Sequence, residues 1–413
     1  MKQTKLALIL ILMLTSGLAR AQKYVGGDIS MLPSYEAQKA TYYDKDGKSV
    51  SNVISFLKEQ GWNTIRVRLF VDPSNDNDKA VVQDLEYVKA LGKRVKDAGF
   101  YFMLDFHYSD TWADPSKQWT PKDWLSMSDD QLYTKIYGYT KDCLNELVAS
   151  KATPDLIQTG NEISYGMLWG GEGTNANRCY SNSTANWSRF TTLLKQAGKA
   201  CREVCPKAKI ILHTERAANT NVLINFYDQM KSAGVDYDVI GLSYYPYFHG
   251  QMSVLDNALT LLESNNYSKE IQVVEAGYPS KWAVKGTTYD YTSVYPYSHE
   301  GQRKFTADLI TMLQKHTQVN GLSWWYAEAN AKGTTGNLST DWYNASLFDN
   351  ETGRALPALY ELKVYGDGDT GIRNITATRP TADIWYTLDG RRLNGTPATR
   401  GLYINNGRKV VRW

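Results

Sequence analysis

The feature that most constrains this chain is an eightfold alternation between short apolar runs and longer stretches with helical period. The apolar runs predict strands at residues 25–31, 64–70, 100–108, 156–163, 209–214, 238–246, 270–278 and 321–326. The stretches that separate and follow them predict helices at residues 50–60, 85–98, 131–149, 187–204, 222–233, 253–264, 301–316 and 356–362. Eight strands that alternate with helices over this length indicate a closed parallel sheet. We therefore expect an α/β fold, a (β/α)8 TIM barrel, over residues 22–365.

A doubly wound open sheet is the main alternative, and it binds phosphate at a glycine-rich turn after its first strand. Here the glycines of Gly26-Gly27-Asp28 come before the apolar part of the first predicted strand. In a barrel, functional side chains gather at the C-terminal ends of the strands. Acidic and aromatic residues crowd the loop after residues 100–108, whereas helix-to-strand turns such as 97–99 are plain. This distribution favours the barrel.

The N-terminal end has the layout of a secretory signal peptide. Two lysines precede an apolar run at residues 6–18, which is followed by the small-residue segment Ala19–Ala21. We expect residues 1–21 to be removed and the protein to be secreted, to the periplasm, the cell surface or the medium. An uncleaved membrane anchor is the alternative. No later segment has the length and apolarity of a membrane span.

The C-terminal end also differs from the barrel. Residues 366–371 are rich in glycine and aspartate, which predicts a linker. Beyond it, strand-like runs at 383–388 and 401–404 come with turn-forming Asp-Gly and Asn-Gly pairs at 389–390 and 406–407. We predict a short β-rich C-terminal extension, so that residues 366–413 form a linker and a small module.

Charge and aromatic content restrict the partners. The formal charge is +3, and the three basic residues of the predicted leader account for all of it. A neutral mature chain gives no sign of nucleic acid or an anionic membrane as partner. The 12 Trp and 29 Tyr favour a polysaccharide substrate, because flat aromatic faces stack on sugar rings, although many of these rings belong to the core. Nothing indicates an oligomer, so we expect a monomer.

Two glutamates stand out at the ends of predicted strands. Glu162 ends the otherwise neutral segment 156–161, and Glu275 follows the uncharged segment Ile271-Gln272-Val273-Val274. A charge there is costly unless it is used or paired. For either glutamate alone, an ion pair with a barrel arginine is an equal alternative. The fourth and seventh strands face one another across a barrel, so the pair predicts the two carboxylates of a glycosidase. We expect Glu162 as acid/base and Glu275 as nucleophile, about 5–5.5 Å apart in a retaining enzyme.

Strand alternation and loop position select the supporting residues. Tyr245 shares the inward parity of Gly241 and Ser243 and could orient the nucleophile, while Trp325 could serve as a sugar platform. Arg68 could bond the Glu275 carboxylate and keep it ionised. Arg66 could equally be a buried structural partner of Asp28 or Asp105. Other residues expected to support catalysis or bind substrate are Asp105, His107, Asp110, Trp112, Asn161 and His213.

Rival chemistries lack their signatures. No Gly-x-Ser-x-Gly turn occurs, which disfavours a serine hydrolase. His107 and His213 lie on different strands without a helical His-Glu-x-x-His partner, so we expect hydrogen-bonded barrel histidines and no metal. The four cysteines have no histidine at zinc-site spacing and are interpreted as buried or bridged structural residues. Two-carboxylate hydrolysis needs no cofactor.

Several segments at the predicted strand ends together resemble glycoside hydrolase family 53, the arabinogalactan endo-β-1,4-galactanases of clan A. The resemblance covers about residues 24–365. The segments that carry it are Gly27–Ser30, Leu104–Pro115, Gly160–Ile163, Gly166–Trp169, Ser243–Pro246 and Val274–Pro279.

The resemblance implies the same roles for Glu162 and Glu275 and adds a substrate, the β-1,4-galactan side chains of pectin, cleaved to galactooligosaccharides. It also implies that a structural calcium can occur in late loops, whose ligands the sequence does not place. The eighth strand departs from the family pattern at Trp324–Glu328, where one Trp followed by an acid and Pro is expected. The alternatives are another clan A retaining endo-glycanase, acting on mannan, xylan or glucan, and a non-catalytic glycan-binding barrel.

Overall fold

The computed structural model describes residues 22–265, 267–366, 385–387, 392–393, 395–405 and 408–412. The chain divides into two compact units, Met1–Gly368 and Asp369–Trp413. The predicted leader at 1–21 and the predicted turns at 389–390 and 406–407 lie outside the described residues, as does the linker predicted at 366–371 except for Gly366, which ends the last helix of the first unit.

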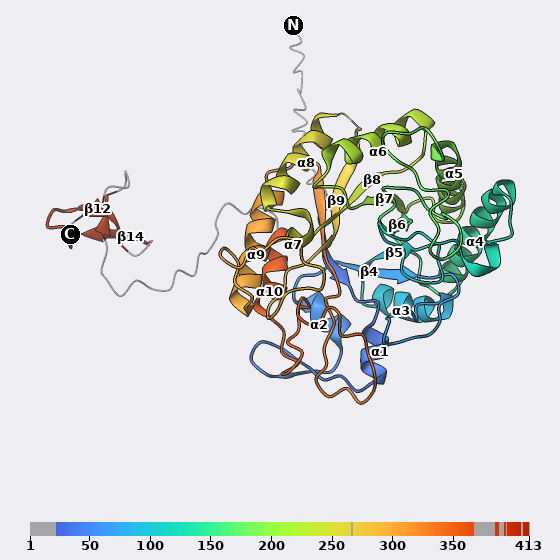
Figure 1. Ribbon diagram of the computed structural model, residues 1–413. Helices are drawn as coiled ribbons and strands as arrows, with labels where there is room; N and C mark the ends of the chain where they lie inside the picture. Colours follow the sequence, from blue (N-terminus) through green and yellow to red (C-terminus); the bar gives the residue numbers. More distant parts are fainter. Residues whose placement is uncertain are drawn as a thin grey trace, which may run out of the picture. The chain divides into compact units, whose positions relative to one another are not determined.

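The first unit is built on a closed barrel of eight parallel strands (Figure 1). Hydrogen bonding runs round the barrel in the order β1, β10, β9, β8, β7, β6, β5, β4 and back to β1. The predicted (β/α)8 barrel is therefore confirmed. Its strands are β1 Tyr24–Asp28, β4 Thr64–Leu69, β5 Tyr101–Phe106, β6 Leu156–Thr159, β7 Lys209–Thr214, β8 Val239–Tyr244, β9 Glu270–Ala276 and β10 Val319–Trp324.

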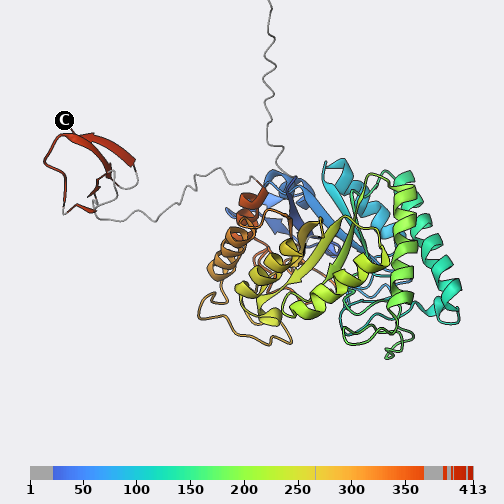
Figure 2. The ribbon, with the colours of Figure 1, turned by 90° about the horizontal axis from the view of Figure 1, so that it is seen from above.

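Helices surround the barrel, as Figures 1 and 2 show from two directions. Local sequence explains where they begin: the Asp84 carboxylate caps α3, and Ser128 and Gln131 form a capping box at α4. In α3 the buried residues Val88, Leu91 and Val95 recur at helical spacing and face the sheet. The helices that alternate with the strands are α2 Val53–Glu59, α3 Leu85–Asp97, α4 Asp129–Ala149, α5 Trp187–Val204, α6 Thr220–Ala233, α8 Met252–Ser264, α9 His299–Leu313 and α10 Pro357–Gly366.

Seven of the eight predicted strands end one to four residues earlier in the structure than the sequence suggested, and after two of them the backbone reverses sharply. The strands predicted at 100–108 and 156–163 stop at Phe106 and Thr159. Beyond these points Tyr108 and Glu162 have φ values of 47° and 48°, in the left-handed region that strands do not use. The chain therefore turns away from the barrel wall just where the sequence becomes polar.

The loops contain short elements that the sequence did not predict. Two short helices follow strands, α1 Leu32–Ala37 after β1 and α7 Pro246–His249 after β8. A two-stranded hairpin, β2 Tyr42–Tyr43 with β3 Ser49–Val50, lies between α1 and α2, and a 3-10 turn, η1 Lys122–Trp124, precedes α4. Each is too short to give a periodic pattern in the sequence.

The barrel interior has an apolar layer and a polar layer. The apolar layer consists of the buried residues Tyr24, Met103, Leu156, Ile211, Val239 and Val274. One step further along the same inward-facing parity come Asp105, Gln158 and His213, which form the polar layer below the C-terminal rim. Gly26 permits β1 and β4 to approach closely, because a Cβ there would lie 1.7 Å from the Thr64 carbonyl oxygen.

The second unit is a four-stranded antiparallel sheet in the order β12, β11, β13, β14. Its strands are β11 Trp385–Tyr386, β12 Arg392–Leu393, β13 Gly401–Asn405 and β14 Arg408–Arg412. The extra C-terminal β structure agrees with the β-rich extension expected from the sequence. Within the described parts of the chain, no helix combines the length and apolarity needed to cross a membrane.

Candidate active site

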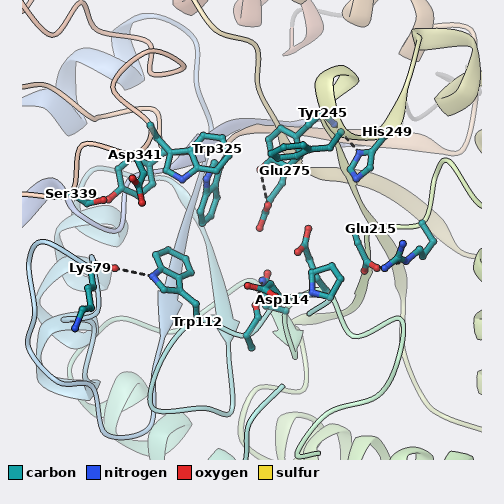
Figure 3. Close-up of a pocket in the computed structure, with 18 residues that line it drawn as sticks. Lys79, Trp112, Asp114, Glu215, Tyr245, His249, Glu275, Trp325, Ser339 and Asp341 are labelled. Atoms are coloured by element: carbon teal, nitrogen blue, oxygen red, sulfur yellow. Dashed lines mark hydrogen bonds and ion pairs between the residues drawn. The ribbon is translucent and has the colours of Figure 1, made fainter. Parts of the chain in front are cut away.

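A pocket of about 530 Å³ opens at the C-terminal ends of the strands, within the size range of ligand sites in proteins. Figure 3 shows Glu275 near its centre, with Trp112 and Trp325 on one side and Glu215 and His249 on the other. Further residues that line it include Lys79, Asp114, Asn161, Glu162, Arg216, Tyr245, Phe248, Asp341 and Trp342. Both predicted catalytic glutamates therefore lie at one pocket.

Glu162 enters the pocket from the turn after β6. Gly160 and Glu162 both have positive φ, at 118° and 48°, so the chain reverses sharply at this point. Left-handed backbone at a glutamate is uncommon and is often retained where function needs it. The Ser243 hydroxyl, from β8, donates to Glu162 Oε1 at 2.7 Å. The turn thus directs the carboxylate across the barrel mouth.

Glu275 reaches the pocket because of an irregularity in β9. Leu242 of β8 pairs with Val273, but the next residue, Ser243, pairs with Glu275, so Val274 is an extra residue in the ladder. This bulge reverses the alternation and turns Glu275 to the same side as Ser243. There the Tyr245 hydroxyl donates to Glu275 Oε2 at 2.7 Å, and Arg66 Nη2 lies 3.0 Å from Oε1.

The two carboxylates lie close together. The Ser243 hydroxyl oxygen is 2.7 Å from Glu162 Oε1 and 3.5 Å from Glu275 Oε2. Those two carboxylate oxygens are therefore separated by no more than the sum of these distances. This arrangement is compatible with the roughly 5–5.5 Å spacing of the two carboxyl groups in retaining glycosidases.

Burial makes both carboxylates harder to ionise, but to different degrees. Burial raises the pKa of Glu275 to about 7, while Arg66 and the Tyr245 hydroxyl act to lower it. Burial raises the pKa of Glu162 well above its usual value, and the nearby Glu275 and Glu215 carboxylates raise it further. Glu275 is thus the carboxylate that ionises more readily and Glu162 the one that keeps its proton, which suits a nucleophile and an acid respectively.

Arg66, rather than Arg68, contacts the predicted nucleophile. Its guanidinium is fully buried and also bonds Gln158, Asp28, Asp105 and Asn161. The prediction that Arg68 bonds Glu275 is therefore wrong.

Arg68 is held in a different direction. Its Nη1 donates to Asp28 Oδ1 at 3.1 Å, and its guanidinium lies 4.5 Å from the centre of the Trp112 ring. The alternative partners considered for Arg66, Asp28 and Asp105, are both present. Arg66 lies two residues before Arg68 on β4, deeper in the barrel, and its side chain is long enough to reach Glu275 at the pocket floor.

The polar layer below the pocket contains other predicted residues. Asp105 Oδ2 contacts His107 Nε2 at 3.1 Å, and His107 Nδ1 accepts from the Ala113 N–H. Burial alone would raise the pKa of Asp105, but Arg66 and His107 outweigh it and lower that pKa. Asn161 lines the pocket and donates to the Ala113 carbonyl, which ties the β6 turn to the loop after β5.

His213 lies fully buried beneath the two glutamates, with Nε2 at 2.8 Å from Ser243 Oγ. Burial and the charge of Arg66 lower its pKa well below the usual value, so the ring is neutral. Asp105, His107 and His213 therefore support the pocket from below and are absent from its lining.

Tryptophans form one wall of the pocket. The Trp112 and Trp325 rings meet edge to face at a centroid distance of 5.8 Å, and Trp342 packs against Trp325 at 6.2 Å. The Trp112 ring is held in place by its Nε1–H, which donates to the Lys79 carbonyl at 2.8 Å (Figure 3). Fixed aromatic faces next to two carboxylates suit a sugar ring that must be held over them.

Asp110 is not part of the pocket. Its carboxylate accepts from the backbone N–H groups of Asp72 and Lys122, at 3.1 and 2.8 Å, and so connects two loops. The expectation that Asp110 supports catalysis or binds substrate directly is therefore not met. The nearby Asp114 lines the pocket instead. Sequence position placed both residues in the same loop, but only the folded loop shows which one turns inward.

Sequence reasoning also missed Glu215, a third buried acid at the pocket. The Ser164 hydroxyl donates to its Oε2 at 2.8 Å, and Arg216 Nε lies 2.6 Å from its Oε1. Its position after β7 repeated the signal that identified Glu162 and Glu275. Lys79, Arg216 and Asp341 come from loops and gave no signal.

The late loops, where the family resemblance implies that a structural calcium can occur, contain the buried acids Glu328 and Asp349. Asp349 is engaged by Lys281 Nζ at 2.9 Å, His299 Nε2 at 3.2 Å and the Thr352 hydroxyl. Across the described residues, no group of three or more His, Cys, Asp or Glu side chains could hold a metal. The four cysteines are buried and form no disulfide.

A parallel barrel with two opposed glutamates of unequal acidity beside a tryptophan wall is the framework of a glycoside hydrolase. The family model for "Glycosyl hydrolase family 53" matches residues 24–362. The chain therefore belongs to glycosyl hydrolase family 53.

Relatives in sequence and structure agree with this assignment. The chain is 33% identical to an arabinogalactan endo-beta-1,4-galactanase of Cellvibrio japonicus, over 82% of this chain and 90% of that protein. A GH53 catalytic domain from Ignisphaera aggregans matches with a TM-score of 0.73 and 33% identity, over 83% and 95% of the two chains. A structure from a study of two fungal beta-1,4-galactanases matches with a TM-score of 0.70 and 29% identity, over 83% and 99%.

Proposed function

We propose that this protein is a retaining endo-β-1,4-galactanase that cleaves β-1,4-galactan, the linear side chain of pectin, to galactooligosaccharides. The observation that carries the proposal is the pair Glu162 and Glu275, which face a common hydroxyl at the floor of a tryptophan-walled pocket. Galactanases among the relatives with 33% and 31% identity support the choice of substrate.

The geometry supports a reaction in two displacement steps. In the first, the Glu275 carboxylate attacks the anomeric carbon while Glu162 gives its proton to the departing glycosidic oxygen, so that an ester to Glu275 forms and the glycosidic bond breaks. In the second, Glu162 takes a proton from a water molecule that attacks the same carbon and releases Glu275. Two inversions leave the anomeric configuration unchanged. Arg66 and the Tyr245 hydroxyl hold Glu275 in its charged form until it attacks.

The reducing sugar released from linear β-1,4-galactan tests this function. We expect oligosaccharides whose newly formed end is initially the β anomer, as NMR taken during the reaction would show. Release from mannan, xylan or cellulose but not from galactan would move the activity to another clan A glycanase. Binding of galactan without any cleavage would establish the non-catalytic alternative, which the two glutamates and their intact contacts disfavour.

Replacing Glu162 by glutamine is expected to lower the turnover of galactan by roughly 10²–10⁴-fold, the usual contribution of a general acid. An aryl β-galactobioside with a dinitrophenyl leaving group should form its covalent intermediate almost normally, because this leaving group departs without a proton. Comparing the burst of phenol with steady-state galactan hydrolysis measures the difference.

Glu172→Gln is the matched control, since Glu172 is an exposed acid in the loop after the same strand. Its activity on both substrates should stay at the wild-type level. An equal loss on both substrates in the Glu162 variant would argue against proton donation by Glu162.

The proposed setting of this activity follows from the ends of the chain and from the chemistry. The signal-peptide layout at residues 1–21 supports secretion of the enzyme, to the periplasm, the cell surface or the medium. The two-step reaction uses two carboxylates and water, so we propose that it requires no cofactor. We further propose that the enzyme acts as a monomer, because each residue in the two steps comes from a single chain.

A further inference from the structure

Ser243 occupies the centre of the site, although neither displacement step gives it a role. Its hydroxyl oxygen is buried and lies 2.7 Å from Glu162 Oε1, 3.5 Å from Glu275 Oε2 and 2.8 Å from His213 Nε2. A hydroxyl has one proton to donate and two lone pairs to accept. Three polar neighbours therefore compete for one donor, and the direction of each hydrogen bond depends on the others.

The proton of His213 can be assigned from the neighbours of the other ring nitrogen. Nδ1 lies 3.0 Å from the Gln158 side-chain nitrogen, and Arg66 holds that amide by donating to its oxygen at 2.7 Å. The Glu162 backbone N–H also points to Nδ1, at 3.4 Å. Nδ1 thus faces two donors and accepts from them.

An acceptor also lies near Nδ1, since Asn161 Oδ1 is 3.0 Å away. That oxygen already accepts from Arg66 Nη2 at 2.8 Å. With two donors at Nδ1, the proton of the neutral His213 ring belongs on Nε2, where it is donated to Ser243 Oγ. The Ser243 proton is then free to point at a carboxylate, and two carboxylates are within its reach.

We propose that Ser243 is a positioning residue whose hydroxyl donates to Glu275 while that carboxylate is free, and to Glu162 once Glu275 carries the sugar. The proposal rests on the retaining mechanism proposed above. In that mechanism the negative charge moves from Glu275 to Glu162 when the ester forms. A rotation of the hydroxyl follows the charge, and Ser243 neither gains nor loses a proton.

The surroundings of the two carboxylates leave Ser243 as the shared group. Of the two carboxylates, Tyr245 and Arg66 contact only Glu275. The hydrogen bond from Ser243 to Glu162 lowers the pKa of Glu162, although burial and the nearby acids raise that pKa by more. The charged and titratable groups that face the pair from the surrounding elements are Asp28, Arg66, Asp105, Asp114, His213, Glu215, Tyr245 and Tyr247.

Ser243→Ala tests the proposal through two pH profiles: that of kcat/KM on galactan, and that of kcat on a dinitrophenyl β-galactobioside, for which hydrolysis of the ester limits the rate. Loss of a donor disfavours the charged form of a carboxylate and so raises its pKa. The acid limb of kcat/KM reports ionisation of Glu275 in the free enzyme, and the acid limb of kcat on the activated substrate reports ionisation of Glu162 in the ester intermediate. Both acid limbs should therefore move to higher pH, and kcat/KM at the optimum should fall by about 10- to 100-fold, the effect of losing a hydrogen bond to a charged group. The alkaline limb of kcat/KM should stay in place, because the one hydroxyl proton is directed to Glu275 in the free enzyme.

Ser346→Ala is the control, because it removes another fully buried serine hydroxyl. The Ser346 hydroxyl donates to the Phe348 carbonyl, and both residues are distant in sequence from Glu162 and Glu275. Its pH limbs should match those of the wild type. If either acid limb stayed in place in Ser243→Ala, the shared role would be overturned while wild-type galactanase activity stands. If the wild-type protein cleaves no galactan, the proposed function fails first, and the limbs measured on its true substrate decide the role of Ser243.

Discussion

Glu275→Ala is expected to lower kcat on galactan by about 10⁵- to 10⁶-fold, the scale seen when the nucleophile of a covalent mechanism is removed. Galactan binding should persist, because the tryptophan wall is untouched. Azide should restore turnover, since alanine leaves space for a small anion that attacks the anomeric carbon directly. One displacement in place of two gives a galactosyl azide of inverted, α configuration, which NMR identifies.

Glu270→Ala is the matched control on the same strand. Glu270 lies at the opposite end of β9, where its carboxylate is 2.6 Å from Lys209 Nζ, and its loss should leave kcat unchanged. If Glu275→Ala kept more than a small fraction of the activity, the nucleophile would have to be another pocket acid. Glu215 would then be the first to test, because it is buried at the same pocket.

Arg66→Met is expected to destabilise the fold by about 3–5 kcal/mol at pH 7, the cost of leaving a buried charge without its partner. Asp28, Asp105 and Glu275 all contact this guanidinium, and all are buried. Denaturant unfolding of the variant and the wild type measures the loss. Activity should fall as well, because Glu275 loses the cation that keeps it ionised.

The destabilisation caused by Arg66→Met should become smaller as the pH falls. Arg66 and His107 hold the folded-state pKa of Asp105 below its usual value, so the wild type keeps this stabilisation above the unfolded-state pKa of about 3.9 and loses it as the pH falls through the folded value. Without Arg66, burial raises the Asp105 pKa. Protonation of Asp105 then stabilises the variant at acidic pH. The difference in the free energy of unfolding between the wild type and Arg66→Met should therefore become smaller as the pH falls.

Arg94→Met provides the comparison, because Arg94 pairs with Glu36 at a half-exposed position on the helix layer. That pair should contribute about 0–1 kcal/mol. A loss in Arg66→Met no larger than in Arg94→Met, or a gap that stays constant with pH, would contradict the role assigned to the buried cluster.

Local sequence predicts the barrel because each strand and helix has its own periodicity, and eight repeats leave one closed arrangement. The positions of Glu162 and Glu275 follow from the same logic, since a charge that ends an apolar strand is visible in the sequence. The inward orientation of Ser243 and Tyr245 also follows from simple alternation along β8 and the residue after it. The roles of these side chains stay predictions until variants are measured.

Contacts that depend on the third dimension could not be predicted. Arg66 and Arg68 share one face of β4, and the choice between them is made by Asp28 and the Trp112 ring, which hold Arg68 away from Glu275. Asp110 and Asp114 belong to one loop, and backbone N–H groups from distant residues draw Asp110 out of the pocket. A single sequence therefore predicts neither which of the two arginines contacts Glu275 nor which of the two aspartates lines the pocket.

The irregular pairing of β9 has a consequence for anyone who transplants this site. Strict alternation from Gln272 and Val274, which face the barrel interior, would point Glu275 toward the surrounding helices. Copying the catalytic side chains into a barrel with evenly paired strands would therefore bury the nucleophile on the wrong side of the wall. A transplanted site must therefore include the β-bulge at Val274 together with Glu275, the acid that follows it.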